Sequence, residues 1–367
     1  MKKVGGILKA MLCAATVVFS AALLMSYLAM RVSPVQWPDL ALFGLAYPLF
    51  LLGTFATFLP LLIKRSRWLW LPLGVLVIGL PVHTGFFAPG LQAARPDNEK
   101  SVLRIMSYNV ELFGFYQFKV KLQRRNAVFE QLSSNPADVY CFQEFFYTHK
   151  TDRFATTDTL VTLLNAPHYH SHFTHEVLGI QYFGIATFSR YPMVNRGVIE
   201  FPNDKNNICI FSDLLIDDQV VRVYNSHLSS IRFSGDEHEY AAGLTAGDAP
   251  VEKRRLLKMY RKIRSAFVKR AWQAELIRDH MASCPFPIIL CGDFNDTPVS
   301  YTYRVFNRIL NDTFRMAGRG IGNTYIGNFP SFRIDYVFTS DEFEPLSARV
   351  LPEKLSDHHA LRVDVQY

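Results

Sequence analysis

Three long hydrophobic stretches fill most of the first 88 residues of this 367-residue chain, and they constrain its fold more than any other feature. They cover roughly Ile7–Met30, Leu40–Ile63 and Trp68–Phe87. Each has about the 20 residues that a helix needs to cross a bilayer. Their four internal prolines are tolerable in membrane helices: Pro48, Pro60, Pro72 and Pro81. We therefore expect residues 1–88 to form three transmembrane helices.

The first stretch has a second interpretation, as a signal peptide, because basic residues precede or open it: Lys2, Lys3 and Lys9. Its apolar run is long for a signal peptide, no clear small-x-small cleavage site follows it, and two more hydrophobic stretches come after it. These features favour a retained membrane helix.

Basic residues around the stretches predict their direction. One group flanks the first stretch, and a second group lies between the second and third: Lys64, Arg65 and Arg67. Only Arg31 lies in the intervening loop. Because short cytoplasmic loops carry an excess of Lys and Arg, both groups are expected in the cytoplasm. Three spans then place everything after Phe87 outside the cytoplasm.

Positive charge is concentrated in two places. The chain has 39 Lys or Arg against 32 Asp or Glu, a net charge of +7 and a pI near 9.1. Up to Glu99 there are eight basic and three acidic residues, and Lys253–Arg270 adds nine basic residues and no acid. What remains has 22 basic and 29 acidic residues. The basic pI is therefore weak evidence for DNA binding.

The five cysteines show neither paired spacing nor a C-x-x-C pattern: Cys13, Cys141, Cys209, Cys284 and Cys291. Cys141 and Cys291 lie in apolar, strand-like runs and are expected to be buried thiols. A disulfide between Cys209 and Cys284 stays open as an alternative.

After a linker rich in turn-forming residues, 89–100, short apolar runs of strand length alternate with helical stretches. The helical stretches include Lys119–Ser133 and Glu252–Met281. The strand-like runs are Val102–Met106, Asp138–Phe142, Ile185–Phe188, Ile208–Ile216, Val220–Tyr224, Ile288–Leu290, Ile334–Phe338 and Leu361–Val365. Residues 101–367 are therefore expected to form an α/β domain of two packed sheets flanked by helices.

The basic stretch 253–270 also carries apolar residues at helical spacing: Leu256, Leu257, Tyr260, Ile263 and Phe267. It can be a solvated face of a helix that docks through its apolar stripe. It can also be a surface for phosphate-rich partners, either anionic lipid or nucleic acid.

Polar residues able to bind metal or phosphate recur at the ends of the strand-like runs: Asn109, Glu144, His227, Asp293, Asn295, Asp335, Asp357 and His358. Each alone has an ordinary explanation, as a turn cap, a surface acid or a core histidine. Together, side chains at strand ends can converge on one pocket. Their oxygen donors suit Mg²⁺ or Mn²⁺, and carboxylates beside histidines supply what phosphoester cleavage needs.

In their order along the chain these motifs resemble the endonuclease/exonuclease/phosphatase superfamily, which has the deoxyribonuclease-I-like fold. The most specific matches are Gly-Asp-Phe-Asn at 292–295, Arg-Ile-Asp-Tyr at 333–336 and Ser-Asp-His at 356–358. The resemblance covers about Val102–Val365 and implies a four-layer sandwich of two mixed β-sheets flanked by helices, with the site at one end of the sheets.

The resemblance also implies roles. Asn109 and Glu144 would be metal ligands, and Asp357 would be a further ligand or a near neighbour of the ion. His227 and Asn295 would contact the scissile phosphate, while Asp293 would position and activate water. Asp335 would orient His358, which would stabilise the transition state or share in water activation. Tyr182 is a candidate for the tyrosine that abasic-site endonucleases use near the phosphate.

The expected function is therefore hydrolysis of phosphoesters, on lipid headgroups or small molecules, by a domain tethered to a membrane. A Mg²⁺-dependent nuclease acting on DNA or RNA is the alternative, and a catalytically inactive binding module is a third. The oligomeric state is not indicated.

The topology can be tested with a reporter that is active only outside the cytoplasm, fused after Arg95. We expect activity, because three spans carry this position across the membrane. A reporter active only in the cytoplasm would contradict the predicted orientation.

Overall fold

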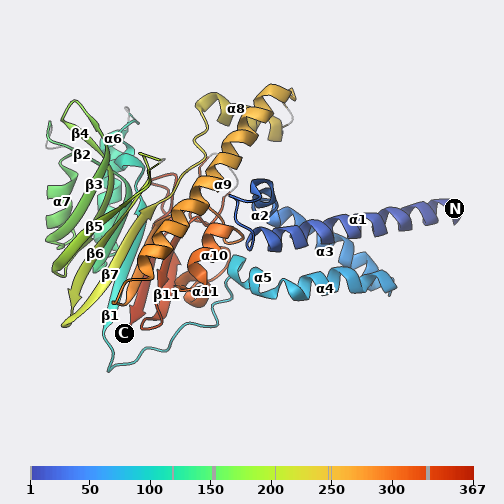
Figure 1. The fold of residues 1–367 in the computed structure, drawn as a ribbon, viewed down its shortest axis with the longest axis horizontal. Helices are drawn as coiled ribbons and strands as arrows, with labels where there is room; N and C mark the ends of the chain where they lie inside the picture. The colour runs from blue at the N-terminus through green and yellow to red at the C-terminus, as the bar shows by residue number, and fades with distance from the viewer. Residues whose placement is uncertain are drawn as a thin grey trace.

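A computed structural model describes residues 2–117, 120–150, 154–202, 204–246, 248, 250–327 and 331–367. Its N-terminal helices project as a bundle from one side of a β-rich domain (Figure 1). The bundle helices are α1 Lys2–Ala29, α2 Ala41–Leu45, α3 Tyr47–Ile63, α4 Trp70–Ile78 and α5 Leu80–Phe86, with 3-10 turns η1 Pro38–Leu40 and η2 Arg67–Leu69. The domain adds η3 Glu111–Gly114, α6 Lys121–Ser134, α7 Thr156–Leu163, α8 Gly235–Ala246, α9 Lys253–Met281, α10 Tyr301–Asn307 and α11 Thr313–Ala317.

Twelve strands in the described ranges form two six-stranded mixed sheets. The first has the order β11-β12-β1-β2-β4-β3 and the second β5-β6-β7-β8-β10-β9. The strands are β1 Val102–Asn109, β2 Val139–Thr148, β3 His168–Val177, β4 Gln181–Ser189, β5 Met193–Glu200, β6 Ile208–Ile216, β7 Gln219–His227, β8 Ile288–Asp293, β9 Asn311–Asp312, β10 Asp335–Thr339, β11 Glu344–Val350 and β12 Leu361–Gln366. In each sheet one central pair is parallel, β1 with β2 and β7 with β8.

The alternation of side chains along the strands builds the layers. In β1, Ile105 packs between the two sheets, and Met106 packs on the outer face of the first sheet with Val128 and Leu132 of α6. On the outer face of the second sheet, Leu290 packs with Ala274 and Ile277 of α9. The predicted four-layer α/β sandwich is confirmed.

Every predicted strand-like run falls on an observed strand, with small shifts at the ends. The runs omitted four strands, β3, β5, β9 and β11, and all four are sheet edges. Edge strands bury less of their surface, so their sequences carry little apolar alternation. In β3, for example, no residue is fully buried, and four of its ten residues are histidines.

The sequence predicted one helix for each of the second and third hydrophobic stretches. In the structure a bend divides each stretch into two helical segments. The segment Pro38–Leu45 meets α3 at an angle of 59°, and Arg67–Ile78 meets α5 at 58°. Pro48 and Pro81 lie in the first turns of α3 and α5, where a missing N–H costs nothing but the preceding residue is disfavoured in a helix. Among the described residues, α1 alone is a helix long and apolar enough to cross a membrane without such a bend.

The bent segments dock on the domain and share its core. Leu23, Tyr47 and Leu76 belong to the same apolar cluster as Phe294 and Tyr336. At Gly44 the backbone approaches Val299 so closely that a Cβ would lie 2.3 Å from the Val299 oxygen. The linker bonds to the domain as well, because Ala94 N–H donates to the Pro345 carbonyl at 2.8 Å. The N-terminal segment is therefore packed against the domain through a common core.

A buried ion pair completes this contact. Arg333 Nη1 lies 2.7 Å from Asp312 Oδ2, and the two side chains are 1% and 0% exposed. Arg333 Nη2 donates to the Gly85 carbonyl of α5 at 2.7 Å. The guanidinium also lies 5.0 Å from the centre of the Tyr336 ring. These contacts join α5 to the segment that immediately precedes β10.

The cysteines within the described residues are free, so the possible Cys209–Cys284 disulfide does not form in this structure. Cys141, Cys209 and Cys291 are buried, as the apolar runs around Cys141 and Cys291 had indicated.

Replacing Arg333 by Met should destabilise the full chain by about 3–5 kcal/mol, because Asp312 would be left buried without a counter-charge. The free energy of unfolding in detergent, followed by tryptophan fluorescence, measures the effect. The matched control is Arg349→Met, since Arg349 is 63% exposed and lies 3.9 Å from Asp364. That control should change stability by less than about 0.5 kcal/mol. Equal small effects of the two variants would show that the buried pair is not important for stability.

Candidate active site

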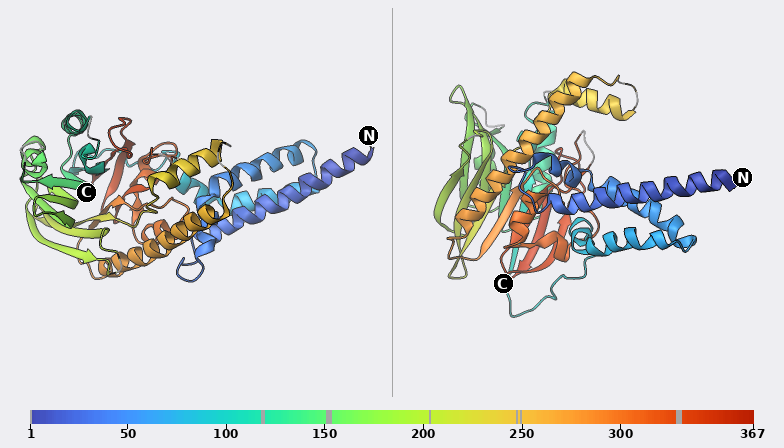
Figure 2. Two further views of the ribbon diagram at one scale, coloured as in Figure 1. Left: turned by 90° about the horizontal axis from the view of Figure 1, so that it is seen from above. Right: turned by 45° about the vertical axis from the view of Figure 1, so that its right-hand side comes forward.

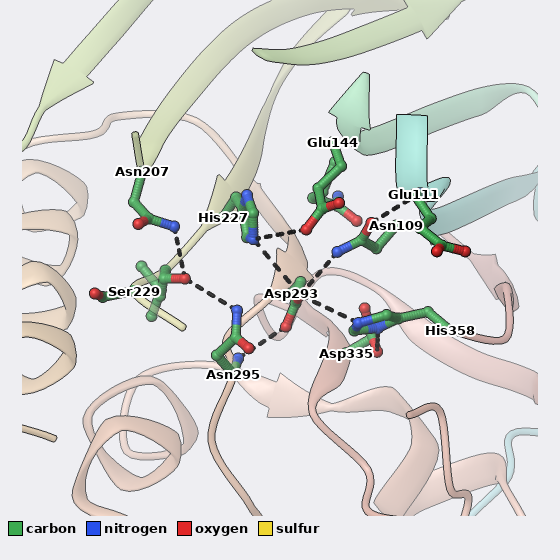
Figure 3. Close-up of polar contacts among 12 residues, drawn as sticks. Asn109, Glu111, Glu144, Asn207, His227, Ser229, Asp293, Asn295, Asp335 and His358 are labelled. Atoms are coloured by element: carbon green, nitrogen blue, oxygen red, sulfur yellow. Dashed lines mark hydrogen bonds and ion pairs between the residues drawn. The ribbon is translucent and has the colours of Figure 1, made fainter. Parts of the chain in front are cut away.

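The eight polar residues singled out in the sequence come from both sheets, and most of them meet at one end of the sandwich (Figure 3). Asn109, His227 and Asp293 are the last residues of β1, β7 and β8. Since β1 is parallel to β2 and β7 to β8, the carboxyl ends of these strands lie at one edge. Asp335 begins β10 and is paired directly with Asp293 across the sheet.

Asp293 lies at the centre of the group and is 1% exposed. Its Oδ2 accepts a hydrogen bond from Asn109 Nδ2 at 3.0 Å. The same oxygen is 3.7 Å from His227 Nε2 and 3.6 Å from His358 Nε2. Oδ1 accepts from the backbone N–H of Asn295 at 2.8 Å. Burial raises the pKa of Asp293, and the neighbouring His358 and His227 oppose that rise.

His358 and Asp335 form a buried dyad. His358 Nδ1 lies 2.8 Å from Asp335 Oδ2. The backbone N–H of His358 donates to Ser356 Oγ at 3.1 Å, and the N–H of Asp335 donates to Thr324 Oγ1 at 3.1 Å. Burial alone would lower the pKa of His358, but the carboxylates of Asp335 and Asp293 outweigh burial and hold this pKa well above its ordinary value. With Nδ1 directed at Asp335, Nε2 faces Asp293.

His227 differs from His358 in its electrostatics. Burial lowers its pKa, and Asp293 only partly opposes this shift, so the neutral imidazole is favoured. Its Nε2 is 3.9 Å from Glu144 Oε1. The Leu228 carbonyl that follows accepts from Asn295 Nδ2 at 3.0 Å and from Asn207 Nδ2 at 2.8 Å. The pKa values of the two histidines beside Asp293 are therefore shifted in opposite directions.

Glu144 lies in an irregular part of β2, where the pairing with β4 shifts between Phe142 and Phe145. Its φ of 49° is rare for a side-chain-bearing residue and is typical of a functional position. Although 37% of the side chain is exposed, protein atoms around the carboxylate displace water. This desolvation, with a contribution from Asp357, raises the pKa of Glu144 to about 7.

The Gly-Asp-Phe-Asn segment needs its glycine. Gly292 has φ of 146°, and a Cβ there would lie 1.9 Å from the Ser226 oxygen of the parallel strand β7. Only glycine lets β8 approach β7 this closely. The close approach is what places Asp293 beside His227 in the register of the two strands.

Two groups of residues offer metal-binding atoms. Ligand atoms of Asp293, Asp335 and His358 lie within 4.8 Å of one another. The second group is the set named from the sequence, Asn109, Glu144 and Asp357. In this set Asp357 is close enough to Glu144 to raise its pKa. Its donors are all oxygens, which suits a hard cation such as Mg²⁺.

Several supporting residues were not found from the sequence. Gln143 and Asn225 are fully buried, and Gln143 Nε2 donates to Asn225 Oδ1 at 2.7 Å between the sheets. Glu111 donates its backbone N–H to Asn109 Oδ1 at 3.2 Å. Gln143 directly precedes Glu144 and Asn225 precedes His227 by two residues, so proximity to a motif was the available signal.

Tyr182 does not join this group. Its hydroxyl donates to the Gly179 carbonyl at 2.9 Å, and its ring packs against His149. Within the described ranges, no hydrogen bond or ion pair links Tyr182 to any of the eight residues. The proposed match to the abasic-site endonuclease tyrosine has no support from these contacts.

Replacing Asp335 by Asn should lower the pKa of His358 by at least about one unit, because a counter-charge is removed from a buried imidazole. Titration by NMR measures the shift, with His280, outside the site, as the internal reference. Since the pKa is raised in the folded state, the charged form of His358 stabilises the fold at low pH. That contribution is lost as the pH rises through the folded-state pKa. An unchanged pKa in Asp335→Asn would contradict the dyad.

A model of the Endonuclease/Exonuclease/phosphatase family matches residues 106–358, and a model of a domain of unknown function matches residues 9–86. Comparison with curated proteins gives no match. Among solved structures, an endonuclease/exonuclease/phosphatase family protein from Bacteroides thetaiotaomicron is 17% identical over 73% of this chain and 98% of its own, with a TM-score of 0.52. The human Nocturnin catalytic domain with bound sulfate is 18% identical over 74% of this chain and 99% of its own, with a TM-score of 0.51. A humanized D. rerio TDP2 with 14 mutations is 15% identical over 72% of this chain and 98% of its own, with a TM-score of 0.50. At these identities the structural likeness shows the fold.

Proposed function

Because the chain belongs to the endonuclease/exonuclease/phosphatase family, we propose that it is a metal-dependent phosphoester hydrolase held in a membrane by its N-terminal helices. The observation that carries the proposal is the arrangement around Asp293. A buried carboxylate lies between one histidine whose pKa is lowered and one whose pKa is raised, and it accepts hydrogen bonds from the Asn109 side chain and the backbone N–H of Asn295 (Figure 3). This combination offers both a proton acceptor and groups that stabilise negative charge.

We assign the metal to Asn109, Glu144 and Asp357. The other group is less suitable, because Asp335 and His358 already bond to each other at 2.8 Å and His358 is cationic. The oxygen donors of the assigned set suit Mg²⁺ or Mn²⁺, and a bound ion would offset the negative charge of the phosphate.

The remaining residues would carry the reaction. Asp293 orients a water molecule and accepts its proton, which its raised pKa favours. The water oxygen forms a bond to phosphorus while the bond to the leaving oxygen breaks. His227 and Asn295 contact the phosphate oxygens. His358, kept protonated by Asp335, stabilises the charge that develops on them.

We place the substrate among lipid headgroups or small phosphoesters, at a membrane surface. Support comes from the apolar residues that the bundle exposes, which include Leu52 at 66% and Ile78 at 67%. The alternative, a nuclease, is less favoured, because the domain outside Lys253–Arg270 carries a net negative charge that does not suit extended duplex binding.

We further propose three spans, with the N-terminus in the cytoplasm and the catalytic domain outside it. The bends divide the second and third stretches, yet α1, α3 and α4 extend from the domain to the same side (Figure 1). The ends of these helices that carry the basic residues at 2, 3 and 64–67 are the ends away from the domain. This distribution agrees with a cytoplasmic location of those ends.

The function is tested with the full chain purified in detergent, since the bundle shares a core with the domain. With Mg²⁺ present we expect hydrolysis of a generic phosphodiester, and a panel of phospholipids, small phosphomonoesters and plasmid DNA identifies the class. Asp293→Asn should lower kcat at least about 10³-fold, because the proton acceptor is lost. The control Asp341→Asn changes an exposed acid outside the site. Equal turnover in both variants would contradict the assignment of Asp293 as the proton acceptor. Turnover of plasmid alone would favour the nuclease.

Glu144→Gln should raise the Mg²⁺ concentration needed for half-maximal turnover at least about tenfold, because a charged ligand is replaced by a neutral one. Glu130→Gln, on the exposed face of α6, is the matched control. A Mg²⁺ requirement that is unchanged in Glu144→Gln would place the ion elsewhere.

A further inference from the structure

The N-terminal part of α9 extends away from the catalytic core. We call residues Lys253–Arg264 the basic arm. Figures 1 and 2 show it pointing outward from the sandwich on the side where the N-terminal helices project. Seven of its twelve residues are Lys or Arg. Three of them open the helix, and the first turn contains no acid. Cations at a helix N-terminus oppose the helix dipole, so this arrangement favours an external anion.

The acids around the basic arm neutralise only part of its charge. Arg255 pairs with Glu252 at 3.1 Å, and Arg264 lies 3.3 Å from Asp39. Lys258 and Lys262 share Glu237 at 2.9 and 2.5 Å. Across the part of the chain that the structure describes, no ion pair engages Lys253, Arg254 or Arg261. Seven cations thus meet three acids, and four positive charges stay uncompensated.

The surface of the basic arm is both cationic and apolar. A shallow groove of about 470 Å³ runs along it, lined by Arg254, Leu257, Lys258, Arg261, Lys262 and Ser265. Leu256 and Leu257 are 38% and 43% exposed, and Val251, just before the helix, is 78% exposed. Exposed aliphatic side chains among cations are typical of helices that lie in the interface of an anionic bilayer.

Two contacts join the basic arm to the N-terminal bundle. Tyr260 donates a hydrogen bond to Asp39 at 2.5 Å, and Arg264 pairs with the same carboxylate. Asp39 belongs to η1, in the connection between α1 and α2 of the N-terminal bundle. Trp37 in that loop is 49% exposed, and tryptophan prefers the membrane interface. From Tyr260 the helix runs on for about 10 Å to its first residue.

We propose that the basic arm lies on the surface of the bilayer that holds the N-terminal helices and binds anionic lipid headgroups there. The inference rests on the proposed membrane insertion. Lipid is favoured over nucleic acid because acyl chains would bury the exposed side chains of Val251, Leu256 and Leu257. A phosphate backbone offers no apolar surface to bury them.

Docking of the basic arm would also orient the active site, because α9 continues without a break to Met281. Further along it, Gln273 Oε1 accepts the N–H of Ser229 at 2.9 Å, and Arg270 Nη1 donates to the Ser229 carbonyl at 3.0 Å. Arg270 Nε also donates to Asp296 at 3.2 Å. One rigid helix thus supports the segments that follow His227 and Asn295 and carries the lipid-binding surface.

The test uses the full chain in lipid nanodiscs with an environment-sensitive dye on Leu257→Cys, after the two less buried cysteines, Cys13 and Cys284, are replaced by Ser. We expect dye emission to rise about threefold when about 30% of the phosphatidylcholine in the disc is replaced by phosphatidylglycerol. At ~0.5 M NaCl the emission should fall back to its value in pure phosphatidylcholine, because salt screens the attraction. Arg254→Glu/Arg261→Glu should abolish the rise. Arg196→Glu/Arg349→Glu, on β5 and β11, makes the same charge change away from the basic arm and should retain it. A label at Val251→Cys repeats the measurement if Leu257→Cys fails to fold.

The proposal would be overturned if dye emission at both labelled positions did not change with lipid charge. It would also be overturned if the rise in emission persisted in Arg254→Glu/Arg261→Glu. So would binding of a duplex oligonucleotide that depends on Arg254 and Arg261 in the absence of a lipid response. Turnover of a soluble phosphodiester, measured on the same discs, should be unchanged in Arg254→Glu/Arg261→Glu. Loss of turnover in every sample with an intact dye response would reject the hydrolase assignment and leave the lipid contact standing.

Discussion

The buried ion pair between Asp312 and Arg333 joins the N-terminal bundle to the β-rich domain. Two charges enclosed together are stable only when further groups satisfy them. Here Tyr303 donates to Asp312 at 2.8 Å, and Arg333 donates to the Gly85 carbonyl of the N-terminal bundle. Because Arg333 lies two residues before Asp335, the N-terminal bundle and the Asp335–His358 dyad have a common support. The bundle is therefore part of the domain's architecture.

The site follows from strand pairing. Two parallel pairs bring the ends of four strands to one edge, and the antiparallel β10 adds Asp335 opposite Asp293. The surroundings of the two histidines then shift their pKa values in opposite directions. The pKa of His358 is raised because two carboxylates face it, whereas the pKa of His227 is lowered because burial dominates there. The same fold thus places two imidazoles with opposite pKa shifts 3.7 and 3.6 Å from Asp293 Oδ2.

Much of the fold could be predicted from the sequence, because central strands such as β6 and β8 are almost continuously buried and apolar. The edge strands could not, since residues such as those of β3 are half-exposed and carry little periodicity. Gly-Asp-Phe-Asn and Ser-Asp-His identified the candidate residues by type and order. Their mutual distances, and the Gln143–Asn225 contact between sheets, depend on tertiary packing that no local pattern encodes. The docking of α2 and α5 on the domain was missed for the same reason.

The proposed reaction at this site is attack of water on phosphorus. The most direct measurement is hydrolysis of a phosphodiester by the full chain with Mg²⁺ in ¹⁸O-labelled water, followed by mass spectrometry of both products. Attack of water on phosphorus predicts one solvent oxygen in the phosphate-bearing product and none in the released alcohol. Label in the alcohol, or no hydrolysis of any phosphoester, would contradict it.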